Sequence, residues 1–153
     1  MNYIPRHYEQ LVLDASAEYG AVMVAGPRQV GKTTMLLQLC RTSERRYVTL
    51  DDLNARELAK NDPVMFFQIY PPPVLVDEVQ YAPELFSTIK LMVDRAKAPG
   101  SFWLTGSQPF LLMDLAQESL AGRAAVLHLA PLSSREIQKA PLTDPFVPDV
   151  LQL

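Results

Sequence analysis

The sequence has little of what exported or membrane-embedded proteins depend on. Its 153 residues include a single cysteine, Cys40, so no disulfide can form within the chain. The N-terminus lacks the long apolar core of a secretory signal, and no apolar run approaches the roughly 20 residues that a membrane helix needs. These absences lead us to expect a cytoplasmic protein with no membrane partner.

An excess of positive charge is missing as well. The chain has 14 Lys and Arg against 17 Asp and Glu, which gives a formal net charge of -3. Such a domain has no overall basic field to attract nucleic acid, so nucleic-acid binding is not indicated, although a further domain could supply it. The length and a hydrophobic content of 48% are typical of one packed globular domain.

Short apolar segments alternate with helical patterns along most of the chain. Strands are expected over residues 21–25, 47–50, 74–76, 101–105 and 124–129, and the fully apolar ones suit strands buried on both faces. Apolar positions at helical spacing, or good helix formers, predict helices over 32–41, 54–60, 63–69, 83–97 and 109–119. This alternation predicts an α/β fold, a parallel sheet with helices on both faces.

The composition changes after the last expected strand. Ser133 and Glu136 have the spacing of a capping box, but four prolines permit only short helical pieces: Pro131, Pro141, Pro145 and Pro148. We therefore expect a core domain over residues 1–130. Residues 131–153 are expected to form a Pro-rich linker or the start of a further region.

A complete phosphate-loop (Walker A) pattern lies between the first expected strand and the first expected helix. Its glycines let backbone N–H groups point at phosphate oxygens, and the helix start adds a favourable dipole. Lys32 is expected to reach the β- and γ-phosphates, and the Thr33 hydroxyl to ligate Mg²⁺. Arg28 either touches the nucleotide or projects toward a partner. The nucleotide-binding candidates are Gly26, Pro27, Arg28, Gln29, Val30, Gly31, Lys32, Thr33 and Thr34.

Two consecutive acids, Asp77 and Glu78, follow the apolar segment 74–76. The carboxyl ends of parallel strands open onto the ligand crevice, so Asp77 is expected to hold Mg²⁺ and Glu78 to orient or deprotonate an attacking water. The alternative is that both acids only solvate the strand end or cap the next turn. Beside a phosphate loop, the pair favours an ATPase over a small-molecule kinase. The chain has no Asn-Lys-x-Asp segment, so a GTP preference has no support.

Three further residues are candidates for sensing or promoting hydrolysis. Ser107 and Gln108 follow the fourth expected strand, where a polar side chain could approach the γ-phosphate, or could instead form a turn and cap ahead of Pro109. Arg123 lies just before the fifth expected strand. It could stabilise the transition state at a neighbouring subunit's nucleotide, or be an exposed arginine near a helix end.

With these motifs assembled, the chain resembles prokaryotic AAA+ P-loop ATPases whose full-length members join an N-terminal ATPase core to a C-terminal domain of unknown function. The resemblance rests on segments spread over most of the chain: Tyr3-Ile4-Pro5-Arg6, Gly26-Pro27-Arg28-Gln29-Val30-Gly31-Lys32-Thr33-Thr34, Leu50-Asp51-Asp52, Asp62-Pro63, Val76-Asp77-Glu78-Val79-Gln80, Leu104-Thr105-Gly106-Ser107-Gln108, Leu120-Ala121-Gly122-Arg123 and Pro131-Leu132-Ser133.

The resemblance implies a three-layer P-loop NTPase fold of ASCE type with strand order 5-1-4-3-2. It also implies that Ser107 or Gln108 acts as sensor and that Arg123 acts in trans within a homo-oligomer. We expect the chain to cover the ATPase core only and to be truncated. The leading hypothesis is binding and hydrolysis of Mg-ATP. The alternatives are an ATP-dependent switch or oligomerisation module with little turnover, and a P-loop small-molecule kinase.

Overall fold

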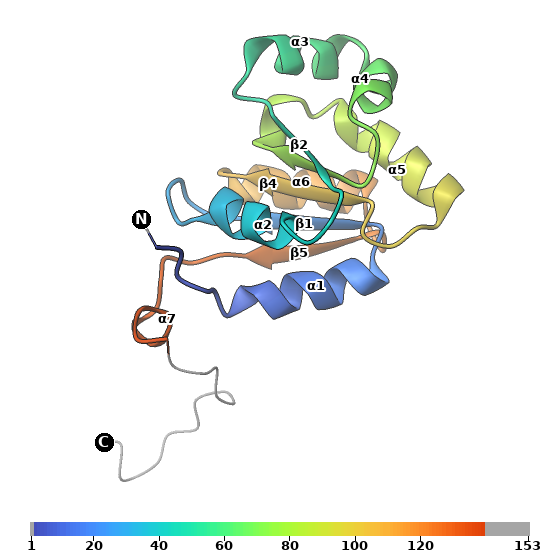
Figure 1. Cartoon of the computed structure of the whole chain (residues 1–153). Coiled ribbons are helices and arrows are strands. Elements are labelled where there is room, and N and C mark those ends of the chain that lie inside the picture. Colours follow the sequence, from blue (N-terminus) through green and yellow to red (C-terminus); the bar gives the residue numbers. More distant parts are fainter. Residues whose placement is uncertain (1, 140–153) are drawn as a thin grey trace.

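Helices and strands alternate along residues 2–139, the part of the chain that the computed structural model describes (Figure 1). The elements in chain order are α1 Tyr8–Glu18, β1 Ala21–Ala25, α2 Lys32–Cys40, β2 Arg46–Thr49, α3 Leu53–Asn61, α4 Pro63–Ile69, β3 Val74–Asp77, the 3-10 helix η1 Val79–Tyr81, α5 Leu85–Ala96, β4 Phe102–Gly106, α6 Pro109–Ser119, β5 Ala124–His128 and α7 Ser134–Ile137. Every expected strand and helix is present. The sequence patterns did not predict α1, because no Ser, Thr, Asp or Asn precedes it and Val12 is its one buried residue.

The five strands form one sheet in the order β2-β3-β4-β1-β5, and every pair of neighbours is parallel. Read from the other side, this is the order 5-1-4-3-2 that the resemblance implied, so that prediction is confirmed. Because all the strands run in the same direction, their carboxyl ends lie together, on the left in Figure 1. The order places β4 between β1 and β3, so the loops after β1, β3 and β4 lie close together at these ends.

Side chains on the two faces of the sheet build two apolar clusters. One face packs against α1 and α2 through Val22, Val24, Leu75 and Trp103. The other face packs against α3, α4, α5 and α6 through Ala21, Met23, Ala25, Val74, Val76, Phe102 and Leu104. Successive residues of a strand point to opposite faces, so strands covered on both sides must be apolar throughout.

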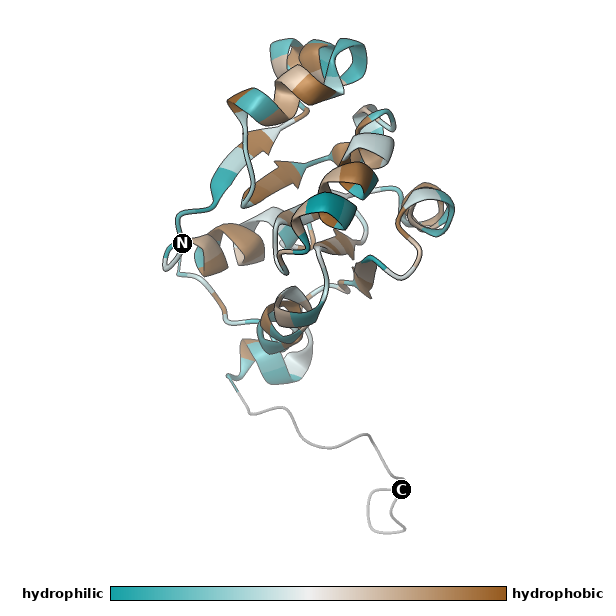
Figure 2. Ribbon diagram, turned by 90° about the vertical axis from the view of Figure 1, so that its right-hand side faces the viewer, coloured by the Kyte–Doolittle hydropathy of each residue, from teal (hydrophilic) through white to brown (hydrophobic). Residues whose placement is uncertain are grey.

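Coloured by hydropathy, the central strands are mostly brown, and the helices around them carry brown and teal residues (Figure 2). This is the three-layer arrangement expected for a parallel sheet with covered faces. Across residues 2–139, none of the helices combines the length and the apolar character needed to cross a membrane.

The segment after β5 is tied to the start of the chain by a buried ion pair. Arg6 Nε lies 3.1 Å from Glu136 Oε1 on α7. The same guanidinium donates to the carbonyl oxygens of Val30 and Ala130, each at 2.6 Å. The described part of the expected linker therefore contacts the core and the loop that precedes α2. The proposed boundary at residue 130 stays a prediction, and residues 140–153, with Pro141, Pro145 and Pro148, lie outside the described part.

The predicted capping box at Ser133 and Glu136 is confirmed, and Glu136 does more than cap α7. Burial alone would raise the pKa of Glu136. The backbone N–H groups of Ser133 and His7 and the Arg6 guanidinium donate to its carboxylate, and together they lower the pKa from 4.5 to about 2. Since the pKa is depressed in the folded state, the associated stability is present above pH 4.5 and is lost as the pH falls toward 2.

We expect Glu136→Gln to lower the free energy of unfolding at pH 7 by about 3 kcal/mol, the scale of such a pKa shift. Urea unfolding at a series of pH values should show the native chain losing this margin between pH 5 and pH 2, while the variant loses less. Glu44→Gln, at an exposed loop position, is the matched control. Equal pH dependence in the native chain and Glu136→Gln would contradict the assignment.

Candidate functional site

The loop between β1 and α2 has an exposed tip, and its last residue is the first residue before helix α2. Pro27, Arg28 and Gln29 are exposed, whereas Val30 is buried. Gly31 has φ +91°, a left-handed conformation that side chains rarely adopt, and it is the residue from which α2 begins. Since the first N–H groups of a helix have no intrahelical acceptor, the start of α2 can receive an anion.

Lys32 is buried at the beginning of α2, with 5% of its surface exposed. Its ammonium donates to the carbonyl oxygens of Gly26 at 2.9 Å and Pro27 at 2.6 Å, so it spans the mouth of its own loop. Burial lowers the pKa of Lys32, and the negative charges of Glu78 and Asp77 oppose that effect. A bound phosphate would be a stronger partner for this ammonium than the two carbonyl groups are.

The carboxylate of Asp77, at the end of β3, accepts hydrogen bonds from three hydroxyl groups. Thr33 on α2 and Thr105 on β4 both donate to Oδ1 at 2.5 Å, and Tyr47 on β2 donates to Oδ2 at 3.3 Å. The predicted metal ligands Thr33 and Asp77 are therefore in contact. Thr105 and Tyr47 were not predicted, because a hydroxyl on a strand gains this role only through the choice of neighbouring strands.

The contact between Thr33 and Asp77 fits a small divalent cation. Within residues 2–139 no cluster of three or more His, Cys, Asp or Glu side chains could hold a metal ion by itself. Mg²⁺ commonly uses one or two protein oxygens together with waters and substrate phosphates, so a hydroxyl and one carboxylate beside a phosphate loop suffice.

Glu78 is held in an unusual backbone conformation directly after β3. Its φ of 57° is left-handed, and its N–H donates to the Thr105 hydroxyl at 3.1 Å. Its carboxylate oxygen Oε2 accepts from Ser107 Oγ at 3.0 Å and from Gln80 Nε2. Of the two candidate sensors, Ser107 thus contacts Glu78, whereas Gln108 is exposed at the start of α6.

Arg28 turns from the loop tip toward η1. Its guanidinium donates to the Tyr81 hydroxyl at 2.8 Å, and the Arg56 guanidinium lies 3.9 Å from the centre of the Tyr81 ring. Both alternatives for Arg28, nucleotide contact and partner contact, remain open. In the described structure, the Arg28 side chain connects the loop tip to η1.

Two adjoining cavities lie beside the loop. The first, of about 250 Å³, is polar and is lined by Arg28, Gln29, Gly31, Lys32, Thr33, Thr34 and Glu78. The second, of about 260 Å³, is lined by Asn2, Tyr3, Ile4, Arg6, Gln29, Val30, Gly31, Thr34, Pro131 and Leu132. Gln29, Gly31 and Thr34 line both. The first cavity is therefore lined by charged groups, and the second, which adjoins it, is more apolar.

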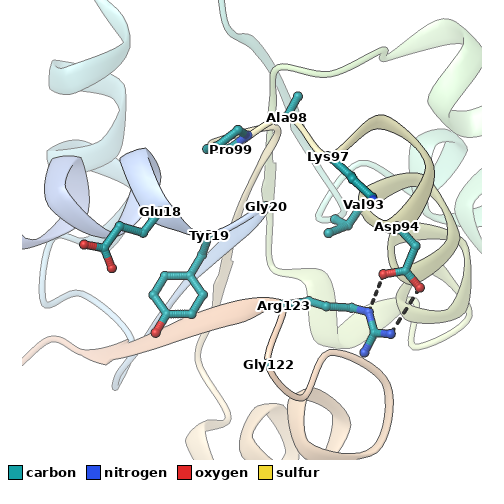
Figure 3. A pocket seen from close by; sticks show the side chains of 10 residues that line it. All are labelled: Glu18, Tyr19, Gly20, Val93, Asp94, Lys97, Ala98, Pro99, Gly122 and Arg123. Atoms are coloured by element: carbon teal, nitrogen blue, oxygen red, sulfur yellow. Dashed lines mark hydrogen bonds and ion pairs between the residues drawn. The ribbon is translucent and has the colours of Figure 1, made fainter.

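Arg123 lies just before β5, at the opposite end of the strands from the phosphate loop. Its backbone oxygen accepts from Ala21 at the start of β1, so the five residues of β1, about 16 Å of strand, separate it from Gly26. Figure 3 shows its side chain paired with Asp94 of α5, with Nε to Oδ1 at 2.6 Å and Nη2 to Oδ2 at 3.1 Å. Arg123 therefore does not reach the phosphate loop of its own chain.

The cavity beside Arg123, about 470 Å³, is larger than either cavity at the loop. Glu18, Tyr19 and Lys97 also line it (Figure 3). No residue of the phosphate loop contributes to it. We therefore assign the nucleotide site by the chemistry of its donors and acceptors rather than by cavity size.

Sequence comparison identifies similar proteins. A family profile described as an AAA domain matches residues 18–138. The uncharacterized proteins Mb2031c of Mycobacterium bovis and Rv2008c of Mycobacterium tuberculosis are each 34% identical to the chain over 117 residues, which is 76% of the chain. The match covers 26% of the length of each mycobacterial protein.

Solved structures share the fold at low sequence identity. The Walker-type ATPase PABY2304 of Pyrococcus abyssi is 19% identical with a TM-score of 0.62, and the match covers 88% of the chain and 55% of that protein. The RuvB Holliday junction branch migration motor of Thermotoga maritima is 18% identical with a TM-score of 0.55, covering 86% and 46% respectively. These likenesses support the P-loop NTPase fold.

We expect Thr105→Val, a change of nearly equal volume, to destabilise the chain by about 1–3 kcal/mol. It leaves the buried N–H of Glu78 without its hydroxyl acceptor, and it removes one of the two hydroxyl donors to Asp77 Oδ1. Chemical denaturation measures this loss, and Thr42→Val, at an exposed position, serves as control. Equal stability of Thr105→Val and the native chain would show that the hydroxyl is not a structural part of the site.

Proposed function

The chain belongs to the AAA domain family, and from that premise we propose that it binds ATP together with Mg²⁺ and hydrolyses it. The observation that carries the proposal is the contact between the Thr33 hydroxyl and the Asp77 carboxylate, beside a buried lysine at the start of a helix. Few other ligand classes need an anion cradle and a cation-binding oxygen pair at the same point.

The triphosphate occupies the polar cavity in this proposal. Lys32 exchanges its two carbonyl contacts for the β- and γ-phosphates, and the N–H groups at the start of α2 face the phosphate oxygens. Thr33 and Asp77 would hold Mg²⁺, which supplies positive charge against the phosphates. The adjoining cavity, with the Tyr3 and Ile4 side chains, then receives the nucleoside.

Hydrolysis follows as an in-line displacement. Glu78 orients the attacking water and accepts its proton, while the bond between the γ-phosphorus and its bridging oxygen breaks and ADP leaves. Glu78 lines the phosphate cavity, as this role requires. Ser107 is the sensor candidate in direct contact with Glu78. Gln108 remains a weaker candidate because its side chain is exposed.

Arg123 acts in trans, at the nucleotide of a second copy. It lies about one strand length from its own phosphate loop and is partly exposed on a cavity wall. A head-to-tail assembly would bring this basic side chain to the phosphate loop of the next copy, and would require Arg123 to leave or share Asp94. The proposal therefore includes a homo-oligomer.

A nucleotide-dependent switch with little turnover is the second candidate. It is favoured by the carboxylate of Glu78, which is already hydrogen bonded to Ser107 and Gln80 rather than left for water alone. The two candidates differ in turnover and agree on Mg-ATP binding.

We expect Lys32→Ala to abolish Mg-ATP binding, and Glu78→Gln to keep binding while lowering turnover by on the order of 100-fold or more. Equilibrium titration with ATP and release of inorganic phosphate measure the two effects. Lys60→Ala, at an exposed position on α3, is the control for loss of a lysine, and thermal unfolding checks that Lys32→Ala is folded.

Each other outcome separates the candidates. Absence of Mg-ATP binding by the native chain, or binding unchanged in Lys32→Ala, contradicts the proposal as a whole. Binding without turnover in the native oligomer favours the switch. Consumption of ATP only when a small-molecule acceptor is added would identify the kinase.

Mixing two inactive variants tests Arg123. In a mixed assembly, Lys32→Ala supplies Arg123 and Arg123→Ala supplies an intact phosphate loop, so turnover should recover when the two are combined. Arg123→Ala alone should bind ATP normally and lose on the order of 1000-fold in turnover. Arg95→Ala, an exposed arginine at the end of α5, is the control. No recovery on mixing excludes action in trans.

A further inference from the structure

Gln80, two residues after Glu78, makes an unusual pair of hydrogen bonds. The side-chain Nε2 of Gln80 donates to Glu78 Oε2 and, at 3.2 Å, to Ser107 Oγ. Ser107 in turn donates to the same oxygen of Glu78. An amide nitrogen carries two hydrogens, so both are used, one on each partner. The three side chains close a ring between η1 and the end of β4.

The oxygen of the same Gln80 side-chain amide has no hydrogen-bond partner among the described residues. Gln80 is 5% exposed, and this oxygen, Oε1, is a buried atom. Turning the amide over would not help, because Oε1 would then face the carboxylate of Glu78. A buried acceptor left unpaired costs about 1–3 kcal/mol, and such costs persist mainly at functional sites.

The space around Gln80 is shaped by Gly106 at the end of β4. A Cβ at Gly106 would lie 2.7 Å from Gln80 Oε1 and 2.2 Å from a methyl group of Leu112. No other residue at this position would leave room for the amide without moving it. The backbone of β4 therefore confines Gln80 from the side opposite its hydrogen bonds.

We propose that Gln80 is a positioning residue for Glu78: its amide nitrogen fixes the carboxylate through Glu78 Oε2 and joins Glu78 to Ser107. The proposal rests on the ATPase function proposed above. It assigns to Gln80 a role that acts through Glu78 and not on the substrate directly.

The ring also links phosphate sensing to Glu78. Ser107 has one hydroxyl hydrogen, which in the described structure goes to Glu78. A γ-phosphate close to Ser107 would compete for that hydrogen, since anionic oxygens form the stronger hydrogen bond. Gln80 would then be the remaining donor to Glu78. The carboxylate therefore stays fixed while its second partner changes with the nucleotide.

The kinetic test compares Gln80→Met, which keeps the length of the side chain and removes the amide, with Gln10→Met at an exposed position. We expect Gln80→Met to lower kcat on the order of 100-fold, the scale of a misplaced catalytic group, and to leave the Kd for Mg-ATP unchanged. An unchanged kcat in Gln80→Met overturns the proposal.

A spectroscopic test does not depend on turnover. In nitrogen-15 spectra of the full chain, the side-chain amide protons of Gln80 should exchange slowly with solvent and should shift in both Glu78→Gln and Ser107→Ala. The side-chain amide of Gln10 is the internal reference. Gln80 signals that exchange as fast as those of Gln10, or that are unaffected by Glu78→Gln, contradict the ring.

The two tests separate this proposal from the proposed function. If the native chain binds Mg-ATP without turnover, the ATPase proposal fails, while the spectroscopic result still decides whether Gln80 holds the carboxylate of Glu78. If turnover is found and Gln80→Met matches the native chain, the ATPase proposal stands and the role of Gln80 is rejected. A Gln80→Met chain with weaker Mg-ATP binding and unchanged kcat would assign Gln80 to binding instead, which also rejects it.

Discussion

The rest of the candidate site depends on the hydrogen bonds that the Asp77 carboxylate accepts. Hydroxyl groups from α2, β4 and β2 donate to it, which joins the helix after the phosphate loop to three neighbouring strands. The Thr105 hydroxyl also accepts the N–H of Glu78 and so fixes the backbone of the proposed water-activating residue. These contacts exist because the sheet order places β4 between β1 and β3.

The apolar sheet stabilises the fold enough to offset unfavourable features at the carboxyl ends of its strands. Lys32, Asp77, Glu78 and Gln80 are buried, Glu78 has a left-handed backbone, and Gln80 Oε1 lacks a partner. Natural sequences tend to break local rules at functional sites and to compensate elsewhere. Here the compensation comes from strands packed on both faces and from the Arg6–Glu136 pair, whose guanidinium also donates to the Val30 carbonyl oxygen of the loop.

Much of this arrangement could be predicted from local sequence, and the exceptions have a common cause. Apolar runs and helical spacing located every strand, and the phosphate loop and the two acids after β3 were visible as motifs. Tyr47, Thr105 and Gln80 were missed because each gains its role only when other segments lie beside it. Likewise, Arg6 and Glu136 are 130 residues apart in sequence. The trans role of Arg123 stays a prediction, since it concerns a second copy.

The most direct test of this account is a calorimetric titration of the full chain with ATP, with and without Mg²⁺, for the native protein and Asp77→Asn. If Asp77 organises a Mg-ATP site, Mg²⁺ should strengthen binding by the native chain markedly and have little effect on Asp77→Asn. Native binding that is indifferent to Mg²⁺, or an Asp77→Asn chain that keeps the full effect of Mg²⁺, would contradict it.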